Sequence, residues 1–592
     1  MFSRSLYVGR QTVAGIPLLM IAVVAKMLPR NADVAEQLEL LSDILELEGE
    51  AAYRLLAYRR AAALVREQSG LVAELALEGK AKELPGIGKT IEGKIVEIVN
   101  EGEIRALTKH KALVPPEVVE FTRLPGLGPK TARKIWQELG VTTLADLKAA
   151  AKAERLRVLP GIGAKLEERI VKELSGKRKA PEEVRPLLGA GLPAVQAVVD
   201  VLREHPASVE VSEAGSVRRR KETFRDLDII ATATEPGELT DYFTKLRWVE
   251  KVAARGESKA TVVSNDGLRF DLRVVPSGLY GNLLQHFTGS KHHNVALRED
   301  AVRRGLSISE NGVKDVESGE IYKTGSEEAL YEFLGYQYIP PELRENLGEL
   351  DAARNGELPR LVELSDLRGD LHLHSTWSSD GKNSIEEMAA EGSRRGYAYL
   401  AITDHSHYLR EGRLEAQERE IDALNERPGR FRILKGIEVN IRADGSLDVD
   451  DETLARRDWV VASLHTAFDK NPTERVLAAM ENPNVDCIGH LTARKINRRG
   501  PADIDLGRIF EQALATKTFL EINSQPDRLD LRDAHARAAA EAGVLLSISS
   551  DAHSVRALGY PELGVGQARR AWMTKEQVLN TRTWPRIKKL LG

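Results

Sequence analysis

The stretch "GDLHLHSTWSSDG", residues 369–381, places two histidines two positions apart and an aspartate six residues after the second. On a strand, residues two apart leave the same face, so His372 and His374 are expected to point to one side. Asp380 would lie in the loop that follows. A single His-x-His pair is as often structural as functional. The rest of the C-terminal third therefore decides between a metal centre and an ordinary strand.

Six further apolar runs in this third alternate with helical stretches, and most end in imidazole or carboxylate residues. They are "YLAITDHS", "ILKGIEVN", "WVVASLH", "VDCIGH", "FLEINS" and "LLSISSDAH". Repeated strand–helix units predict a barrel of parallel strands, in which the carboxyl ends of the strands meet at one mouth. The candidate ligands at that mouth are His372, His374, Asp380, His405, Glu438, His465, His490, Asp551 and His553.

Nine such ligands suit a cluster of two or three Mn²⁺ or Zn²⁺ ions, which would make water reactive toward a phosphate ester. His407 lies off the pattern as a surface or substrate-contact residue, and His535 is expected on a helix, in solvent. The pattern resembles the polymerase and histidinol phosphatase (PHP) domain. That resemblance implies a distorted (β/α)7 barrel with all nine residues as metal ligands.

The first third contains one motif three times. The copies are "LPGIGKTIEGKI" from Leu84, "LPGLGPKTARKI" from Leu124 and "LPGIGAKLEERI" from Leu159. A glycine turn before a helix exposes backbone N–H groups that suit a phosphate. Ordinary hairpins with glycine caps are the alternative. The set resembles helix-hairpin-helix motifs, which implies DNA-backbone binding through Gly86, Gly88, Gly126, Gly128, Gly161 and Gly163, helped by Lys89, Lys94, Lys130, Arg133, Lys134 and Lys165.

The middle of the chain carries three candidate carboxylates. Asp226 and Asp228 lie two apart in "AGSVRRRKETFRDLDII", residues 214–230, and Asp271 lies in the later run "LRFDLRVV". Three acids on one face need cations between them, and oxygen ligands suit Mg²⁺ or Mn²⁺. Acids at strand ends are also common without function. Upstream, Ser216 with Arg218, Arg219 and Lys221 forms a candidate triphosphate clamp.

These residues, with "HFTGSKHHNVALR" at 286–298, resemble the palm of family X DNA polymerases, the group that contains DNA polymerase beta. The resemblance implies three metal ligands, Asp226, Asp228 and Asp271, and deoxynucleoside triphosphates as substrates. It also implies nucleotide contacts at Ser216, Arg219, Phe287, Gly289, Asn294 and Arg298. Arg220 and Arg225, the latter preceded by Phe224, replace family glycines, and His286 replaces a tyrosine. These departures predict weaker polymerisation or altered sugar discrimination.

Two residues near the N-terminus are candidates for a lyase site. The run "RLLAYRRAA" at 54–62 and the first glycine hairpin resemble the lyase domain of the same family. The resemblance implies that Lys94 attacks an abasic sugar and that Tyr58 supports it. A lysine that only contacts phosphate is the alternative.

The whole chain has 592 residues and a formal net charge of −4, so total charge does not indicate a nucleic-acid partner. Its single cysteine, Cys487, excludes an intramolecular disulfide framework and fits the cytoplasm. The apolar run within residues 1–26 is too short to cross a bilayer, so no membrane partner is expected. We expect a monomer.

The domain order resembles the bacterial type of family X DNA polymerase. That implies a gap-filling repair enzyme with 3′–5′ exonuclease activity in the barrel, or abasic endonuclease or 3′ phosphatase activity. Two alternatives stay open: a DNA-binding nuclease with an inactive or weak palm, and a phosphatase of small phosphomonoesters.

The predicted domains are an extension or misassigned start (1–26), a helical lyase-like DNA-binding domain (27–106), a helix-hairpin-helix fingers-type domain (107–185), a nucleotidyltransferase palm (186–275), a thumb-type nucleotide-selection domain (276–345), a linker (346–367) and the barrel (368–592).

Overall fold

The computed structural model describes residues 28–591 except 30, 51, 68–71, 85–86, 125–126 and 176–183. The chain divides into two compact units. One ends at residue 181, and the other runs from residue 182 onward without the turn at 265–267. The extension expected at 1–26 lies outside the described residues. No helix in the described ranges combines the length and the apolar run needed to cross a bilayer.

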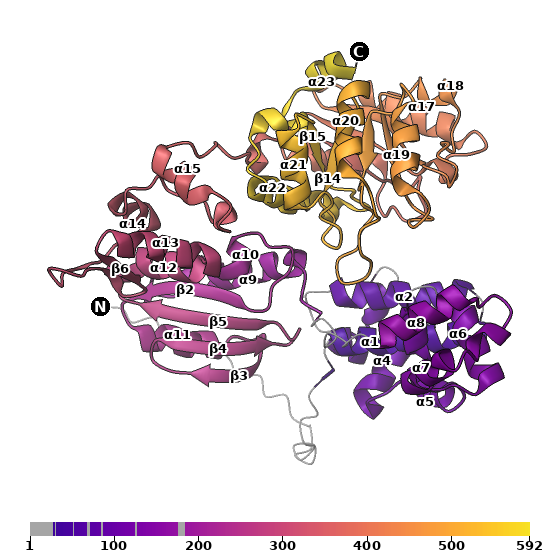
Figure 1. The fold of residues 1–592 in the computed structure, drawn as a ribbon, viewed down its shortest axis with the longest axis horizontal. Helices are drawn as coiled ribbons and strands as arrows, with labels where there is room; N and C mark the ends of the chain where they lie inside the picture. The colour runs from indigo at the N-terminus through magenta and orange to yellow at the C-terminus, as the bar shows by residue number, and fades with distance from the viewer. Residues whose placement is uncertain are drawn as a thin grey trace, which may run out of the picture. The chain divides into compact units, whose positions relative to one another are not determined.

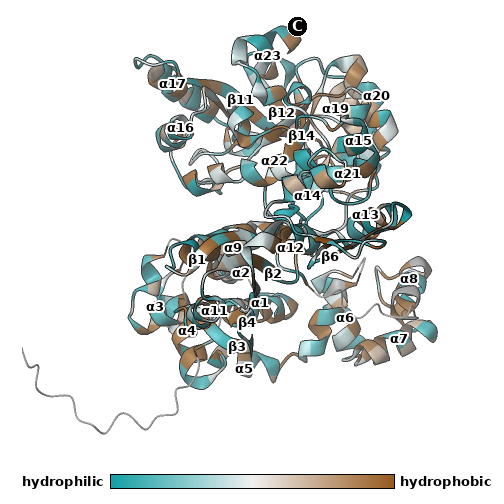
Figure 2. Ribbon diagram, turned by 90° about the vertical axis from the view of Figure 1, so that its left-hand side faces the viewer, coloured by the Kyte–Doolittle hydropathy of each residue, from teal (hydrophilic) through white to brown (hydrophobic). Residues whose placement is uncertain are grey.

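The first unit is built from short helices around one core (Figure 1). Its helices carry hydrophobic residues beside hydrophilic ones, as amphipathic helices around a core do (Figure 2). Leu38, Ile95, Phe121 and Ile135 are fully buried in this core. The helices are α1 (Asn31–Glu48), α2 (Ala52–Glu67), α3 (Val72–Leu77), α4 (Lys89–Glu101), α5 (Arg105–Lys111), α6 (Pro129–Leu139), α7 (Leu144–Lys152) and α8 (Ala164–Ser175).

The second unit begins with a mixed five-stranded sheet of order β1-β2-β5-β4-β3. Only β2 and β5 pair in parallel. Along β5, Phe270, Leu272 and Val274 are buried and alternate with polar residues on the open face. The elements are α9 (Leu188–Arg203), β1 (Ser208–Glu213), α10 (Gly215–Arg218), β2 (Leu227–Ala233), α11 (Pro236–Thr244), β3 (Val249–Arg255), β4 (Lys259–Ser264) and β5 (Arg269–Val275).

Helices and a small antiparallel sheet follow the mixed sheet. In the segment at 346–367, the structure has helix α15, whose Glu349 is fully buried and lies 2.7 Å from Nδ1 of His293. That segment is therefore packed against the preceding elements. The elements are α12 (Tyr280–Thr288), α13 (Lys291–Arg303), β6 (Leu306–Ser309), β7 (Gly312–Asp315), β8 (Ile321–Tyr322), α14 (Glu327–Phe333) and α15 (Glu349–Asn355).

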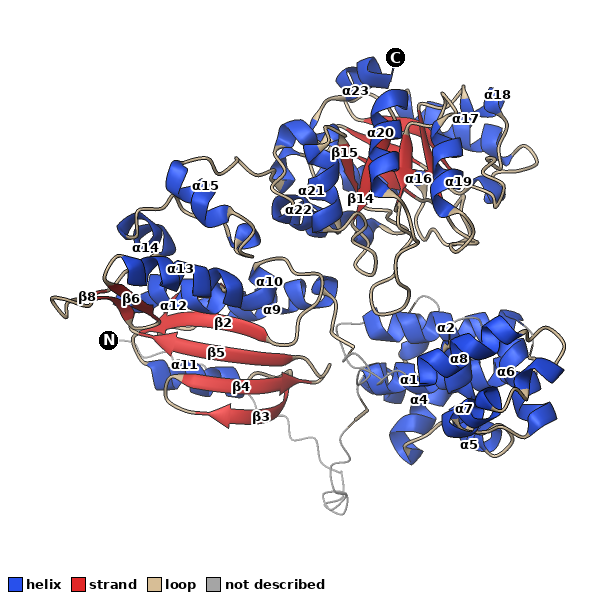
Figure 3. Cartoon of the chain, in the orientation of Figure 1, coloured by secondary structure: helices blue, strands red, loops and turns tan. Residues whose placement is uncertain are grey.

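The C-terminal part is a parallel barrel of seven strands in sequence order. A bridge between Leu373 and Ala552 links the last strand region to the first and nearly closes it. Figure 3 shows the strands enclosed by helices. The strands are β9 (Gly369–Leu373), β10 (Tyr399–Ile402), β11 (Arg432–Asn440), β12 (Trp459–Ser463), β13 (Cys487–Gly489), β14 (Phe519–Asn523) and β15 (Leu546–Ser549).

The helices of the barrel pack their apolar sides against the strands, the first seven in one large core and the last in a second core. They are α16 (Ile385–Arg394), α17 (Arg413–Asn425), α18 (Asp451–Leu454), α19 (Pro472–Met480), α20 (Leu506–Thr516), α21 (Asp533–Glu541), α22 (Pro561–Arg570) and α23 (Trp584–Leu591). Leu529 and Leu563 of this part belong to the core of the mixed sheet, so the barrel and the sheet share a hydrophobic junction. The predicted fold class, helical domains, a mixed α/β region and a seven-stranded barrel, is confirmed.

Candidate active sites

The mouth of the barrel brings together the nine residues expected there. Each lies at or just beyond the carboxyl end of a strand, or in the loop that follows β9, as the barrel topology requires. Glu438 of β11 is the centre of the group and is almost completely buried. Its oxygens lie 2.7 Å from His405 Nδ1, 3.2 Å from His490 Nε2, 3.3 Å from His465 Nε2, 3.4 Å from His372 Nε2 and 3.6 Å from His374 Nε2.

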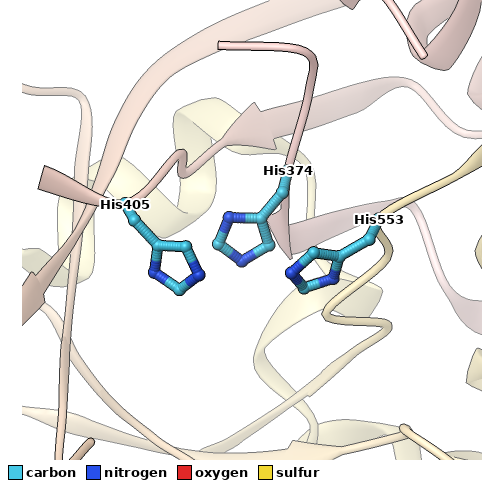
Figure 4. Close-up of side chains that lie close together, drawn as sticks. All are labelled: His374, His405 and His553. Carbon is cyan, nitrogen blue, oxygen red and sulfur yellow. The ribbon is translucent and has the colours of Figure 1, made fainter. Parts of the chain in front are cut away.

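Two aspartates complete the group on the other side. Asp551 Oδ1 lies 3.3 Å from His374 Nε2, and Asp380 Oδ2 lies 3.4 Å from both His405 Nε2 and His553 Nε2. Figure 4 shows the rings of His374, His405 and His553 side by side, carried by three different segments. Residues as far apart in the chain as His372 and His553 therefore form one site.

Several polar atoms at this site are buried without a hydrogen-bond partner among the described residues. Both oxygens of Glu438, both ring nitrogens of His374 and Nε2 of His372 have no hydrogen-bond partner among the described residues. Leaving buried polar atoms unpaired costs free energy, so such a cluster indicates a bound group. Sets of three of these side chains have ligand atoms within 4.8 Å of one another, which fits divalent cations.

The electrostatics of the cluster favour cation binding. Burial, with neighbouring cationic side chains, lowers the pKa of both His374 and His490 to about 3, so these rings are neutral. Burial would raise the pKa of Glu438, but the surrounding histidines hold it well below its usual range. Burial also opposes the charged ring of His405, yet Glu438 outweighs it and raises that pKa to about 10. Neutral imidazoles and ionised carboxylates are the forms that bind metal, so His374, His490 and Glu438 are in the binding form, and a cation would have to displace a proton from His405.

Two residues that the sequence analysis missed orient the histidines. Glu521 of β14 lies 2.8 Å from His372 Nδ1, and Asn440 Oδ1 lies 2.6 Å from His465 Nδ1. A partner on the second ring nitrogen fixes the tautomer and the direction of a metal-binding histidine. The run "FLEINS" contained the signal for Glu521, because it is an acid near a strand end.

The mixed sheet places its three aspartates as the sequence predicted. Asp228 of β2 and Asp271 of β5 are direct partners in the parallel register, and Asp226 precedes β2. Arg269 Nε lies 3.4 Å from Asp226 and 3.1 Å from Asp271. Burial, followed by the charges of Asp271 and Asp226, raises the pKa of Asp228 to about 7. Three carboxylates that repel one another in this way could hold divalent cations between them.

Gly215 is required by the close approach of helix α10 to this triad. Its φ is +63°, and a Cβ at this position would lie 2.2 Å from the Asp228 carboxylate. Any other residue would push the carboxylate away. The backbone of the Gly-Ser pair is thereby held directly against Asp228.

A cavity of about 850 Å³ opens in front of Asp226 and Asp228. It is lined by every residue expected to contact nucleotide: Ser216, Arg219, Phe287, Gly289, Asn294 and Arg298. Two of these lining residues, Asn294 and Arg298, also contact His286 of helix α12. Asn294 Nδ2 donates to the His286 carbonyl at 2.8 Å, and Arg298 Nη2 lies 3.1 Å from His286 Nδ1. His286 therefore shapes this wall of the cavity in place of the family tyrosine.

The structure corrects the role expected for Arg218. Its guanidinium donates two hydrogen bonds to Glu327, at 3.0 and 2.7 Å, and one to the Thr288 hydroxyl at 2.6 Å. Arg344 also pairs with Glu327, which makes a buried Arg–Glu–Arg group. Arg218 does not line the cavity and belongs to this structural group, because the short helix α10 turns its side chain away.

Arg220 and Phe224, which stand where the sequence departs from the family pattern, do not fill the cavity. The Phe224 side chain is buried in the core of the mixed sheet, where it packs on Gly191. Arg220 has a φ of +57°, and its Nη1 donates to the Val217 carbonyl at 3.0 Å. This left-handed backbone explains why glycine suits position 220. Arg225, in contrast, is exposed and lines the cavity.

Replacing Arg220 by glycine is expected to leave the KM for nucleotide unchanged within about twofold. Relief of the left-handed backbone, worth about 1 kcal/mol, offsets the loss of the contacts of its side chain. The free energy of unfolding should therefore change by less than about 1 kcal/mol, measured by urea denaturation. A tenfold fall in KM would show instead that the arginine obstructs the cavity.

Comparison with known proteins agrees with this geometry. Family models match as a helix-hairpin-helix domain at 29–104, a SAM-like helix-hairpin-helix tandem at 118–175, the DNA polymerase beta thumb at 283–345 and a PHP domain at 370–540. The chain is 39% identical over 562 residues to the DNA polymerase/3′-5′ exonuclease PolX of Bacillus subtilis, covering 93% of this chain and 97% of that protein. The chain belongs to the family X DNA polymerases that carry a PHP domain.

Two more distant relatives each match one part of this family X polymerase. DNA polymerase lambda of Rattus norvegicus is 26% identical over 347 residues, which cover 53% of this chain and 56% of that protein. A probable phosphatase of Thermoanaerobacter sp. (strain X514) is 30% identical over 233 residues, which cover 36% of this chain and 89% of that protein.

The helix-hairpin-helix turns of this family X polymerase leave space above their second glycines. Gly88 and Gly128 are exposed, cap α4 and α6 with extended backbone, and a Cβ there would meet no described atom within 4 Å. Gly161 has a φ of +93°, and a Cβ at Gly161 or Gly163 would also meet nothing described. Packing of the described chain does not demand glycine at 88 or 128. Gly86 and Gly126 lie outside the described residues.

Replacing both Gly88 and Gly128 by alanine is therefore expected to weaken DNA binding by about tenfold, with a change in unfolding free energy of about 1 kcal/mol or less. The added methyl groups would keep a phosphate from the helix N-termini. Fluorescence anisotropy with gapped DNA measures the affinity. Gly93→Ala, an exposed position inside α4 with nothing described within 4 Å, is the matched control and should bind DNA normally. Equal affinity in all three proteins would count against phosphate binding at these turns.

The two residues of the expected lyase site lie together. Nζ of Lys94 is 5.8 Å from the centre of the Tyr58 ring, and Tyr58 is buried. A cation near an aromatic face is a favourable contact. It is compatible both with the lyase interpretation and with a lysine that only contacts phosphate.

The basic loop beside the barrel mouth holds the domains of the polymerase together. Arg494 pairs with Glu222 of the palm and donates to the Leu529 carbonyl, and its side chain is 11% exposed. Lys495 Nζ lies 2.8 Å from Asp527. Arg494 is therefore an interface contact between the PHP domain and the palm, whereas the pair of Lys495 lies within the PHP domain. His535 lies on α21 as predicted, but it is half-buried and not in solvent as expected.

Proposed function

We propose that the chain is a DNA repair polymerase that fills short gaps at the palm and removes nucleotides from 3′ ends at the PHP barrel. The proposal is carried by one observation: a single compact unit contains two separate clusters of cation ligands. One is the Asp226–Asp228–Asp271 triad at a cavity lined with basic residues, and the other is the nine-residue cluster centred on Glu438.

At the palm, this chain's own residues orient the substrates. Ser216, Arg219, Phe287 and Gly289 line one cavity. Ser216 and Arg219 would contact the triphosphate there, and Phe287 and Gly289 the sugar. The growing 3′ oxygen forms a bond to the α-phosphorus as the bond to pyrophosphate breaks. Mg²⁺ or Mn²⁺ held by the three aspartates would supply charge that polarises the hydroxyl and neutralises the leaving pyrophosphate.

At the barrel, the geometry suits hydrolysis of a phosphate ester. Glu521 and Asn440 hold His372 and His465 in fixed directions, so the ligand set is preorganised. Mn²⁺ or Zn²⁺ held by the cluster would lower the pKa of water and neutralise charge on the phosphate. The deep burial of Glu438 and His374 limits access of bulk water to the innermost ligands.

The assay that tests this function uses one-nucleotide-gapped DNA with Mg²⁺ or Mn²⁺, with and without nucleotides, analysed on a sequencing gel. Extension by one residue with nucleotides, and shortening from the 3′ end without them, are the expected products. DNA shortening with no extension under any metal would instead identify a nuclease with an inactive palm. Arg220 does not line the cavity, and the Phe224 ring, at the cavity edge, is buried in the core of the mixed sheet, which supports an active palm.

A 3′ phosphatase activity of the barrel is a second candidate, favoured by its similarity to a probable phosphatase over most of that protein's length. The same cluster would cleave a terminal phosphomonoester. Release of phosphate from a 3′-phosphorylated oligonucleotide, compared with a free sugar phosphate, tests it. Preference for the oligonucleotide is expected because the chain carries DNA-binding hairpins, and preference for the sugar phosphate would identify a small-molecule phosphatase.

A further inference from the structure

The PHP domain supplies part of the wall of the palm cavity. Arg532 and Asp533, at the start of α21, and Arg570, at the end of α22, line it together with Ser216 and Arg219. The lining contains eight Arg and Lys residues against four Asp and Glu residues. Such an excess of positive charge suits a triphosphate, and two of the eight cations come from the PHP domain.

Arg570 is held in one place by four hydrogen bonds. Its Nη1 donates to the Arg219 carbonyl at 2.9 Å and to Glu345 Oε1 at 3.0 Å. Its Nε and Nη2 donate to Asp533 Oδ2 at 2.9 and 2.6 Å. Its side chain is only 3% exposed. A buried guanidinium with this many partners is rigid.

Arg219 is connected to this network through both its backbone and its side chain. Its Nε donates to Glu345 Oε1 at 3.1 Å, the same oxygen that Arg570 contacts. Its Nη1 donates to the Thr288 carbonyl. On the next residue, the Arg220 carbonyl accepts a hydrogen bond from Gln567 Nε2 at 3.1 Å. Hydrogen bonds from Arg570 and Gln567 of helix α22 therefore hold the turn that carries Arg219.

We propose that the PHP domain completes the nucleotide site of the palm, with Arg570 as a positioning residue for Arg219 and Arg532 as a further contact for the triphosphate. This inference rests on the proposed polymerase function. Arg570 acts through Arg219, whereas Arg532 is exposed at the cavity and can meet the phosphates directly. Removing or loosening the PHP domain would then weaken nucleotide binding even though the three aspartates remain.

The test compares Arg570→Lys, Arg532→Ala and Arg569→Ala in the full-length chain. A lysine at 570 keeps the charge, but one ammonium cannot span Arg219, Glu345 and Asp533 at once. Arg569 is the matched control, because it lies on the same helix and pairs with Glu342 at 2.7 Å but does not line the cavity. Incorporation of one nucleotide into a gap is measured as a function of nucleotide concentration.

The KM for nucleotide is expected to rise about tenfold in Arg570→Lys and in Arg532→Ala, with kcat changed less than about threefold, since each loses a charge-assisted contact. Arg569→Ala should keep the KM of the unsubstituted protein. Degradation of DNA with Mn²⁺ should continue in all three variants, which shows that the barrel is folded. Arg532→Ala, at an exposed position, keeps the test valid if Arg570→Lys fails to fold.

Equal KM values in all variants, or an equal rise in all three including Arg569→Ala, would overturn the inference. In the second case the interface as a whole, and not these two residues, would matter. Calorimetric titration with a Mg²⁺–nucleoside triphosphate separates the inference from the proposed function. A protein that loses this binding in Arg570→Lys and Arg532→Ala, but never extends DNA, would refute polymerisation and support the shared site.

Discussion

Incorporation of nucleotides into gapped DNA is expected to fall by more than about 100-fold when Asp226 and Asp228 are both replaced by asparagine. Even residues that only orient metal ligands contribute about 10–100-fold, so loss of two ligand carboxylates should cost more. The shape of the site is kept, because Asn is isosteric with Asp. Extension of a labelled primer opposite a one-base gap measures the effect.

Degradation of the same DNA with Mn²⁺ is expected to continue at an unchanged rate in this double variant, because the nine barrel ligands are intact. The thermal stability in a chelating buffer should be equal or higher, since two of three mutually repelling carboxylates have been removed. Simultaneous loss of synthesis and degradation, in a protein that remains folded, would refute the two-site proposal.

Replacing Glu438 by glutamine is expected to reduce degradation of DNA by more than about 100-fold and to leave nucleotide incorporation unchanged. Glu438 lies within 3.6 Å of five of the six histidines of the cluster, so its removal affects most of the ligands at once. Glutamine keeps the volume but removes the charge that a cation needs. Release of labelled nucleotides with Mn²⁺ measures the activity, and metal analysis of the purified protein should show fewer bound ions.

His407→Ala is the control for this substitution. His407 lies next to the cluster and is exposed, and it is not among the nine residues. Its removal should change degradation by less than about threefold. A Glu438→Gln protein with full activity and full metal content would place the degradative site elsewhere in the chain.

The sequence predicted the barrel and its cluster because the signal was local. Parallel barrel strands end at one mouth, so reading the residue after each apolar run was enough to find His372, His405, Glu438 and His490. The Asp226–Asp228 pair was found in the same way, from alternation along a strand. The helix-hairpin-helix turns repeat a local backbone pattern, and they too were visible without a structure.

Contacts between distant segments could not be predicted. Arg218 and Arg219 are neighbours in the chain, but one pairs with Glu327 and the other faces the cavity. Phe224 directly precedes one of the arginines that depart from the family pattern, and its ring packs on Gly191 in the core. These outcomes depend on where helix α10 points its side chains and on which residues of other elements meet them.

The sequence alone determined which chemical groups the chain places at strand ends and helix starts, because the periods of strands and helices are fixed by backbone geometry. Only the tertiary structure decided which polar groups pair. Glu521 pairs with His372, Arg494 with Glu222, and Arg570 with the backbone carbonyl of Arg219. The physical reason is distance. Hydrogen bonds and ion pairs act over a few ångströms, so partners that are hundreds of residues apart are defined only once the chain has folded.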